Sequence, residues 1–79
     1  MTPTIMQYQR FRFFFFSREE KRKHVHAETP EGEAKFWLEP EIELAMNQGA
    51  RPHDIAIIKK FIKDHFSEIS DAWDKHFGH

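Results

Sequence analysis

Two histidines separated by one residue are the side chains in this chain best suited to chemistry. His24 and His26 flank Val25, and Glu28 follows two positions later. On a β-strand, alternate side chains project to the same face, so the three would form a row of nitrogen and oxygen donors. Imidazole and carboxylate groups can bind a divalent metal, and imidazoles can transfer protons near neutral pH. The row permits three interpretations: metal binding, acid–base catalysis, or a polar surface without chemistry.

A divalent metal is the first hypothesis, with His24, His26 and Glu28 as candidate ligands. Positions i and i+4 on a strand lie about 13 Å apart, which is too far for His24 and Glu28 to share one ion without movement. A third ligand would have to come from another strand, or from Glu19 or Glu20 in the preceding loop. No other cofactor is indicated, because the chain has no cysteine and only three glycines.

A metal-independent, ribonuclease-like reaction is the second hypothesis. Two imidazoles beside an ammonium group could take a proton from a ribose hydroxyl, protonate the leaving oxygen and stabilise charge on phosphorus. The candidate catalytic residues are His24, His26 and Lys35. Basic residues just before the histidines could hold a nucleic-acid backbone, namely Arg18, Lys21, Arg22 and Lys23.

The elements that must position these residues are predicted from hydrophobic periodicity. Two-residue alternation indicates strands, and polar or Pro/Gly-containing segments indicate the connections between them. The predicted strands are residues 4–16, 24–29, 34–39 and, as a short fourth strand, 42–46. The polar segment 17–23 is predicted to be a loop, and Pro30–Gly32 a turn.

The rest of the chain has the period of an amphipathic helix. Apolar residues recur at three- and four-residue steps from Ile55 to Phe77, with Phe66 or His65 in the stripe. Pro52 suits the first helical position and Gly78 the C-terminal cap. One helix of about 39 Å is expected, with a bend allowed at residues 65–67. Three lysines of this helix are interpreted as a solvated face: Lys59, Lys60 and Lys63.

Together these elements predict one α+β domain over residues 1–79. A small, three- to four-stranded, mainly antiparallel sheet over about 4–46 would have one long C-terminal helix, about 52–77, packed on one face. The helix should cover the face that carries Val25, Ala27 and Phe36, because that face is the more apolar. The histidines then belong to the opposite, open face.

An open sheet face with aromatic side chains would be a binding surface. Trp37 shares the histidine face, and Phe14 and Phe16 join it in one of the possible strand registers. Monomers seldom leave such a patch bare, so Phe14, Phe16 and Trp37 are candidate partner-binding residues. The expected partner is a second copy of the chain or another small protein.

Several segments together carry a family resemblance. They are Pro3–Ile5, an aromatic strand ending at Ser17, His24–Ala27, Glu33–Pro40, Gly49, and a helix with Trp73 and Phe77. The chain is similar to a small bacterial family, the domain of unknown function 4160, and the His-x-His followed by Ala-Lys-Phe-Trp-Leu is the most specific part. Relatives usually have two prolines before the first histidine, where this chain has Arg22 and Lys23. A role carried over to the histidines therefore rests on residue type and not on loop geometry.

The resemblance implies partners more than chemistry, because the family has no settled activity. Its members often look like halves of two-gene modules of toxin–antitoxin type, so the resemblance implies a partner encoded by a neighbouring gene. No segment approaches the roughly 18 apolar residues of a membrane helix, and the N-terminus does not resemble a signal peptide. We therefore expect a cytoplasmic protein-interaction module, with the metal-binding or ribonuclease-like enzyme as the alternative.

Overall fold

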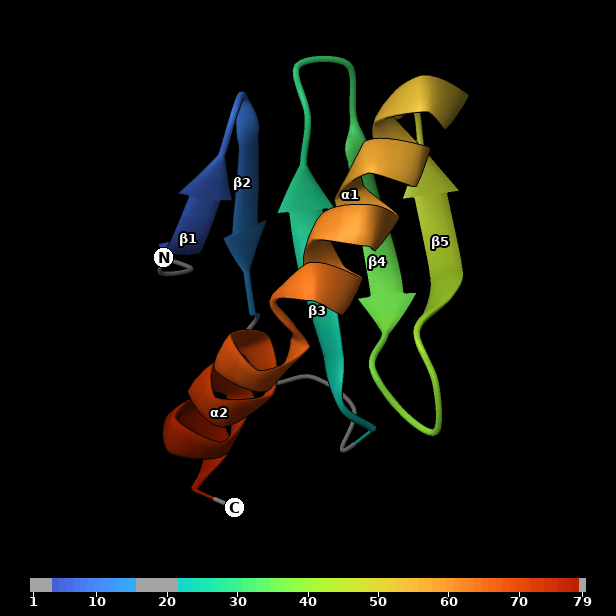
Figure 1. Cartoon of the computed structure of the whole chain (residues 1–79). Helices are drawn as coiled ribbons and strands as arrows, with labels where there is room; N and C mark the ends of the chain where they lie inside the picture. The colour runs from blue at the N-terminus through green and yellow to red at the C-terminus, as the bar shows by residue number, and fades with distance from the viewer. Residues whose placement is uncertain (1–3, 16–21, 79) are drawn as a thin grey trace.

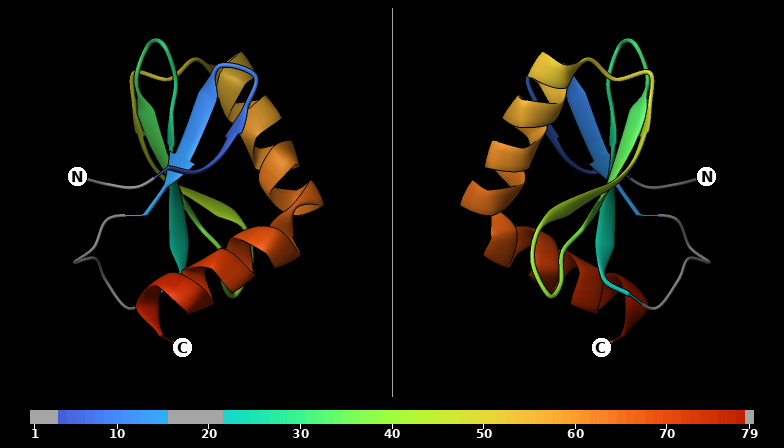
Figure 2. Two further views of the ribbon diagram at one scale, coloured as in Figure 1. Left: turned by 90° about the vertical axis from the view of Figure 1, so that its left-hand side faces the viewer. Right: turned by 90° about the vertical axis from the view of Figure 1, so that its right-hand side faces the viewer.

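The computed structural model describes residues 4–15 and 22–78. Within them the chain forms five strands and two helices in two layers (Figure 1). The elements are β1 (Thr4–Tyr8), β2 (Phe11–Phe14), β3 (His24–Glu28), β4 (Glu33–Trp37), β5 (Glu43–Gln48), α1 (Pro52–Asp64) and α2 (Phe66–Phe77). The strands pair antiparallel in the order β1-β2-β3-β4-β5; α1 lies over one face of the sheet, and α2 runs across the end of the sheet (Figure 2). The α+β class is confirmed, but the numbers of strands and helices differ from the prediction.

The predicted long first strand is a hairpin. β1 and β2 pair with Tyr8 opposite Phe11, so only Gln9 and Arg10 form the connection. Gln9 adopts a left-handed backbone with φ of 55°, which such tight hairpins require but which Asn or Gly usually supplies. The turn is also held from outside, because Arg10 Nη2 donates to Asp54 Oδ1 of α1 at 2.8 Å. Arg10 and Asp54 are 44 residues apart in the sequence, so the local residue pattern could not predict this turn.

The predicted single helix is two helices that meet at His65. His65 has φ of −118° and ψ of 26°, so it ends α1 and precedes α2. A straight helix of about 39 Å would exceed the longest dimension of the molecule, 33 Å. The change of direction falls inside the segment where a bend was allowed, and it lets both apolar stripes reach the same sheet.

The core lies between the helices and one face of the sheet. That face is the predicted one and includes Val25, Ala27 and Phe36. Buried strand residues pack against buried helix residues, which are Ile58, Phe61, Ile62, Ile69 and Trp73. Neither α1 nor α2 is long and apolar enough to cross a membrane.

The turn between β3 and β4 sets the register on which the histidine-bearing face depends. The Thr29 backbone N–H donates to the Gly32 carbonyl at 2.7 Å, and the Gly32 N–H donates to Thr29 Oγ1 at 2.9 Å. Gly32 also lies against the backbone of Gln48 and Gly49 at the end of β5. The turn therefore joins three strands and aligns β3 with β4.

Candidate functional site

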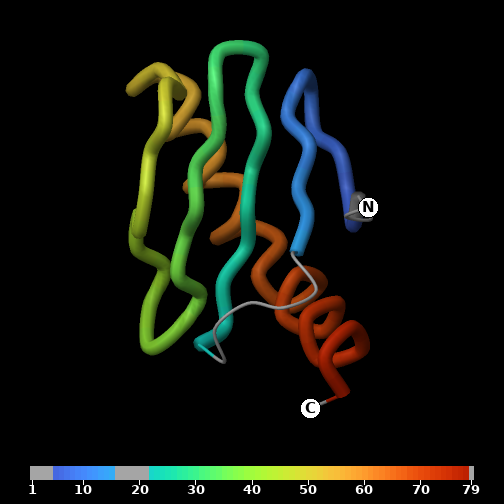
Figure 3. The backbone as a smooth tube through the Cα atoms, turned by 180° about the vertical axis from the view of Figure 1, so that it is seen from behind, coloured from blue at the N-terminus to red at the C-terminus, as the bar shows by residue number. Residues whose placement is uncertain are grey.

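The strand register brings most of the predicted site residues onto one face of the sheet. His24 is opposite Trp37, and His26 is opposite Lys35 on one side and Phe14 on the other. This face, called the histidine face below, is turned away from α1. It points toward the viewer in Figure 3, where α1 lies behind the sheet. Phe14 thus shares the face with the histidines. The sequence alone did not determine this, because the strand register was unknown. Phe16 lies outside the described residues.

His24 is part of the interior and not of an open surface. Its side chain is 0% exposed. Its Nδ1 lies 2.7 Å from the Arg22 carbonyl oxygen, which can only accept, so Nδ1 carries the proton. The ring makes edge contacts with Trp37 on β4 and Trp73 on α2, at centroid distances of 5.7 and 5.0 Å. The first histidine therefore joins the two layers.

His26 is equally enclosed, at 3% exposed. Its ring stacks on Phe14 at 5.3 Å and meets the His24 ring edge-on at 5.2 Å. Its Nδ1 lies 3.4 Å from a carboxylate oxygen of Glu33. The prediction of an open face with exposed histidines and an exposed Phe14 is wrong in this respect, because all three side chains are buried.

Trp37 remains half-buried and is covered by cations. The Arg22 guanidinium carbon lies 4.2 Å from the centre of the indole, and Lys35 Nζ lies 4.5 Å from it. Arg22 Nε also donates to the Glu39 carbonyl at 3.0 Å. Cation–π contacts of this kind stabilise by roughly 0.5–2 kcal/mol each. Lys35 is opposite His26 in the sheet, and its ammonium group packs on the tryptophan.

The predicted basic cluster is not gathered at one place. Lys23 turns to α2, where Nζ donates to Ser70 Oγ at 2.9 Å and lies 3.0 Å from Asp74 Oδ1. Arg22 packs on Trp37 instead. Arg18 and Lys21 lie outside the described residues. The two described candidates, Arg22 and Lys23, contact different elements and do not form a shared basic site.

The proposed metal ligands are not arranged as a metal site. The part of the chain that the structure describes holds no cluster of three or more His, Asp or Glu side chains able to bind an ion. Glu28 instead accepts from Arg12 Nε at 3.1 Å. Glu19 and Glu20, the alternative ligands, lie outside the described residues. The described residues of this face therefore do not form a metal-binding site.

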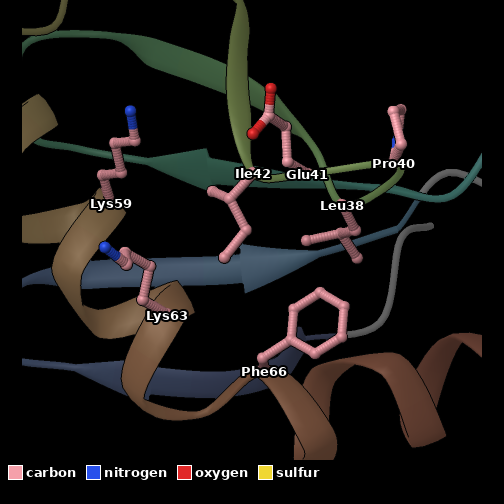
Figure 4. Close-up of a pocket in the computed structure, with 7 residues that line it drawn as sticks. All are labelled: Leu38, Pro40, Glu41, Ile42, Lys59, Lys63 and Phe66. Carbon is pink, nitrogen blue, oxygen red and sulfur yellow. The ribbon is translucent and has the colours of Figure 1, made fainter.

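A groove on the helix side was not predicted. It lies between the β4–β5 connection, α1 and the start of α2, and has a volume of about 520 Å³ (Figure 4). Its lining residues are Leu38, Pro40, Glu41, Ile42, Lys59, Lys63 and Phe66. Phe66, one of the two residues that the helix pattern allowed at this position of the apolar stripe, is 36% exposed. Pro40, which lies in the β4–β5 connection, was the available sequence signal that the chain turns away from the sheet here.

The architecture and the two surfaces define a class: a small α+β domain with a five-stranded antiparallel meander, two C-terminal helices and no metal cluster among its described residues. The chain belongs to the family described as Domain of unknown function (DUF4160), whose model matches residues 10–74. This confirms the resemblance seen in the sequence. No match was found among curated proteins or among solved structures.

Proposed function

We propose that the domain is a protein-interaction module that binds its partner through the groove beside α1. The observation that carries this proposal is the distribution of exposed apolar side chains. Among the described residues the exposed large apolar side chains are Phe66 (36%), Leu44 (40%) and Tyr8 (37%), and of these Phe66 lines the groove, whereas His24 and His26 are enclosed. Leu44 pairs with Phe36, so it belongs to the helix side of the sheet and continues the apolar surface along β5.

The groove has the composition of a protein-binding surface. Its apolar part, formed by Leu38, Ile42 and Phe66, is bordered by Lys59 and Lys63. Protein interfaces typically have an apolar, often aromatic centre within a polar rim. This agreement supports a protein partner over a small polar metabolite.

The surface proposed here differs from the one expected from the sequence. Phe14 is buried, so it cannot anchor a partner. Trp37 is the described residue of the histidine face that could still do so, but Arg22 and Lys35 already lie over its ring. The groove offers an exposed aromatic ring without such cover, and we prefer it for that reason.

The partner we propose is the second protein of a two-gene module of toxin–antitoxin type, acting in the cytoplasm. The family resemblance motivates this choice. A second copy of the chain is the other partner that the surface permits, because β5 is an outer strand of the sheet and carries the exposed Leu44. Exposed edge strands with apolar residues are common sites of pairing between chains.

Acid–base catalysis on RNA has less support. A general base must reach the hydroxyl proton of its substrate, within about 3 Å or through one water. His24 and His26 are both buried, and the Nδ1 proton of His24 is engaged by the Arg22 carbonyl. A substrate could meet these rings only after the surrounding structure had opened.

The test is the mass of the protein in solution. Light scattering after size exclusion should show a complex when the chain is mixed with the product of the neighbouring gene, or a dimer when it is alone. Phe66→Ser should reduce that species without lowering the free energy of unfolding by more than about 1 kcal/mol, because the side chain is partly exposed. A strict monomer at high concentration that forms no complex would overturn the proposal.

A further inference from the structure

We infer that the groove binds a short acidic peptide segment, in which one bulky apolar side chain is followed by carboxylates. This inference rests on the proposed function, because it specifies the partner's contact segment. It is carried by the juxtaposition of an apolar hollow and two lysines, Lys59 and Lys63, for which the described part of the chain supplies no carboxylate at ion-pair distance.

The apolar half of the groove suits one large side chain. Leu38 forms its base and is buried, while the ring of Phe66 remains partly exposed at the start of α2. Figure 4 shows Ile42, Leu38 and Phe66 around the same hollow. Each square ångström of apolar surface removed from water there contributes about 25 cal/mol, so a Leu or Phe side chain of the ligand would gain most from this position.

The charged half of the groove suits carboxylates. Lys59 and Lys63 are four residues apart on α1, so their ammonium groups lie on one face and repel each other. Within residues 4–15 and 22–78, no carboxylate lies at ion-pair distance from either lysine. Lys60 differs, because it pairs with Asp64 at 3.0 Å. An arriving carboxylate would therefore relieve a repulsion without breaking an existing pair.

The opposite rim argues against a nucleic acid. Glu41, in the β4–β5 connection, borders the groove across from the lysines. A polyanion along the groove would meet the Glu41 carboxylate and would leave the apolar base uncovered. A peptide can instead place its apolar residue over the base and direct its carboxylates only to α1.

The size and shape of the groove favour a segment of a chain. A volume of about 520 Å³ lies within the usual range of ligand pockets. The groove is open to solvent, and its residues come from the β4–β5 connection, α1 and α2, so an extended polypeptide could lie along it. A small apolar acid would fill the hollow but would gain little from an open surface.

The test uses a synthetic peptide, acetyl-Gly-Ser-Phe-Glu-Glu-amide, titrated into the full chain labelled with ¹⁵N. The amide resonances of Leu38, Ile42 and Phe66 should shift as peptide is added and should reach a plateau when the groove is saturated. The double variant Lys59→Glu/Lys63→Glu should weaken binding about tenfold or more, as expected when two ion pairs of roughly 0.7 kcal/mol each are lost. A matched control, Lys60→Glu/Lys75→Glu, changes the net charge equally outside the groove and should keep most of the affinity.

Three further probes complete the design. The analogue with Gln in place of Glu should bind several-fold more weakly, and a single-stranded RNA and octanoate should shift the groove resonances little. Equal binding of the Gln analogue, equal loss in both double variants, or stronger binding of RNA or octanoate would overturn the inference. Shifts confined to other residues would do the same.

The inference and the proposed function fail separately. If the chain forms a complex with its partner that Lys59→Glu/Lys63→Glu leaves unchanged, the acidic segment is wrong and the interaction module stands. If the peptide binds as described but no protein complex or dimer forms, the groove chemistry stands and the proposed function is wrong.

Discussion

At the residue scale, His24 is held by a hydrogen bond to the Arg22 carbonyl and by the rings of Trp37 and Trp73. His24→Ala should lower the free energy of unfolding by about 2–4 kcal/mol, because it leaves a cavity and a carbonyl without its donor. His24→Asn should cost less, since its amide nitrogen can replace Nδ1. Urea unfolding measures both. A His24→Ala variant as stable as the parent would show that the ring is not part of the core.

The Arg10–Asp54 pair is the second residue-scale case. Asp54 is 1% exposed, while the Arg10 side chain is half exposed. Arg10→Ala should cost about 1–3 kcal/mol, because it leaves a carboxylate buried without its cation. Lys60→Ala, which breaks the exposed pair with Asp64, should cost no more than about 0.5 kcal/mol. Equal losses in urea unfolding would contradict the structural role of the Arg10 contact.

At the element scale, Gly32 joins β3, β4 and β5 through close backbone approach. A Cβ at this position would overlap the Gln48 carbonyl oxygen. Gly32→Ala should therefore destabilise the fold by more than about 2 kcal/mol, since backbone on both sides must move. Gly78→Ala is the control. Gly78 has φ of 78° but open space around it, so the substitution should lower the free energy of unfolding by only about 1 kcal/mol, through the left-handed backbone conformation. The reverse order in thermal or urea unfolding would contradict this account of the turn.

Elements with a strong local signal were predictable, and those decided by distant contacts were not. Residues 24–28 and 33–37 alternate cleanly and form β3 and β4, and the apolar stripe located α1 and α2. The turn at Gln9–Arg10 carries no Gly, Asn or Pro, and its anchor, Asp54, is 44 residues away from Arg10. The sequence therefore predicts one strand over residues 4–16, where the structure has the hairpin of β1 and β2.

At the scale of the whole molecule, faces could be predicted but burial could not. Alternation placed His24, His26, Lys35 and Trp37 on the side of the sheet without α1, and the register agrees. Whether that side is open depends on what the rest of the chain does in three dimensions, and the histidines are enclosed. The groove also could not be predicted from local sequence, because it forms only where α1, α2 and the β4–β5 connection meet.

The central claim is that partner binding uses the groove and not the histidine face. The most direct measurement is the affinity of the neighbouring gene product for three forms of the chain, by isothermal calorimetry: the parent, Phe66→Ser and Trp37→Ala. Phe66→Ser should weaken binding by about tenfold or more, as expected for an aromatic residue at the centre of an interface. Trp37→Ala should leave the affinity within about threefold, within the scatter expected outside the interface. Loss of binding in Trp37→Ala with retention in Phe66→Ser would contradict the account.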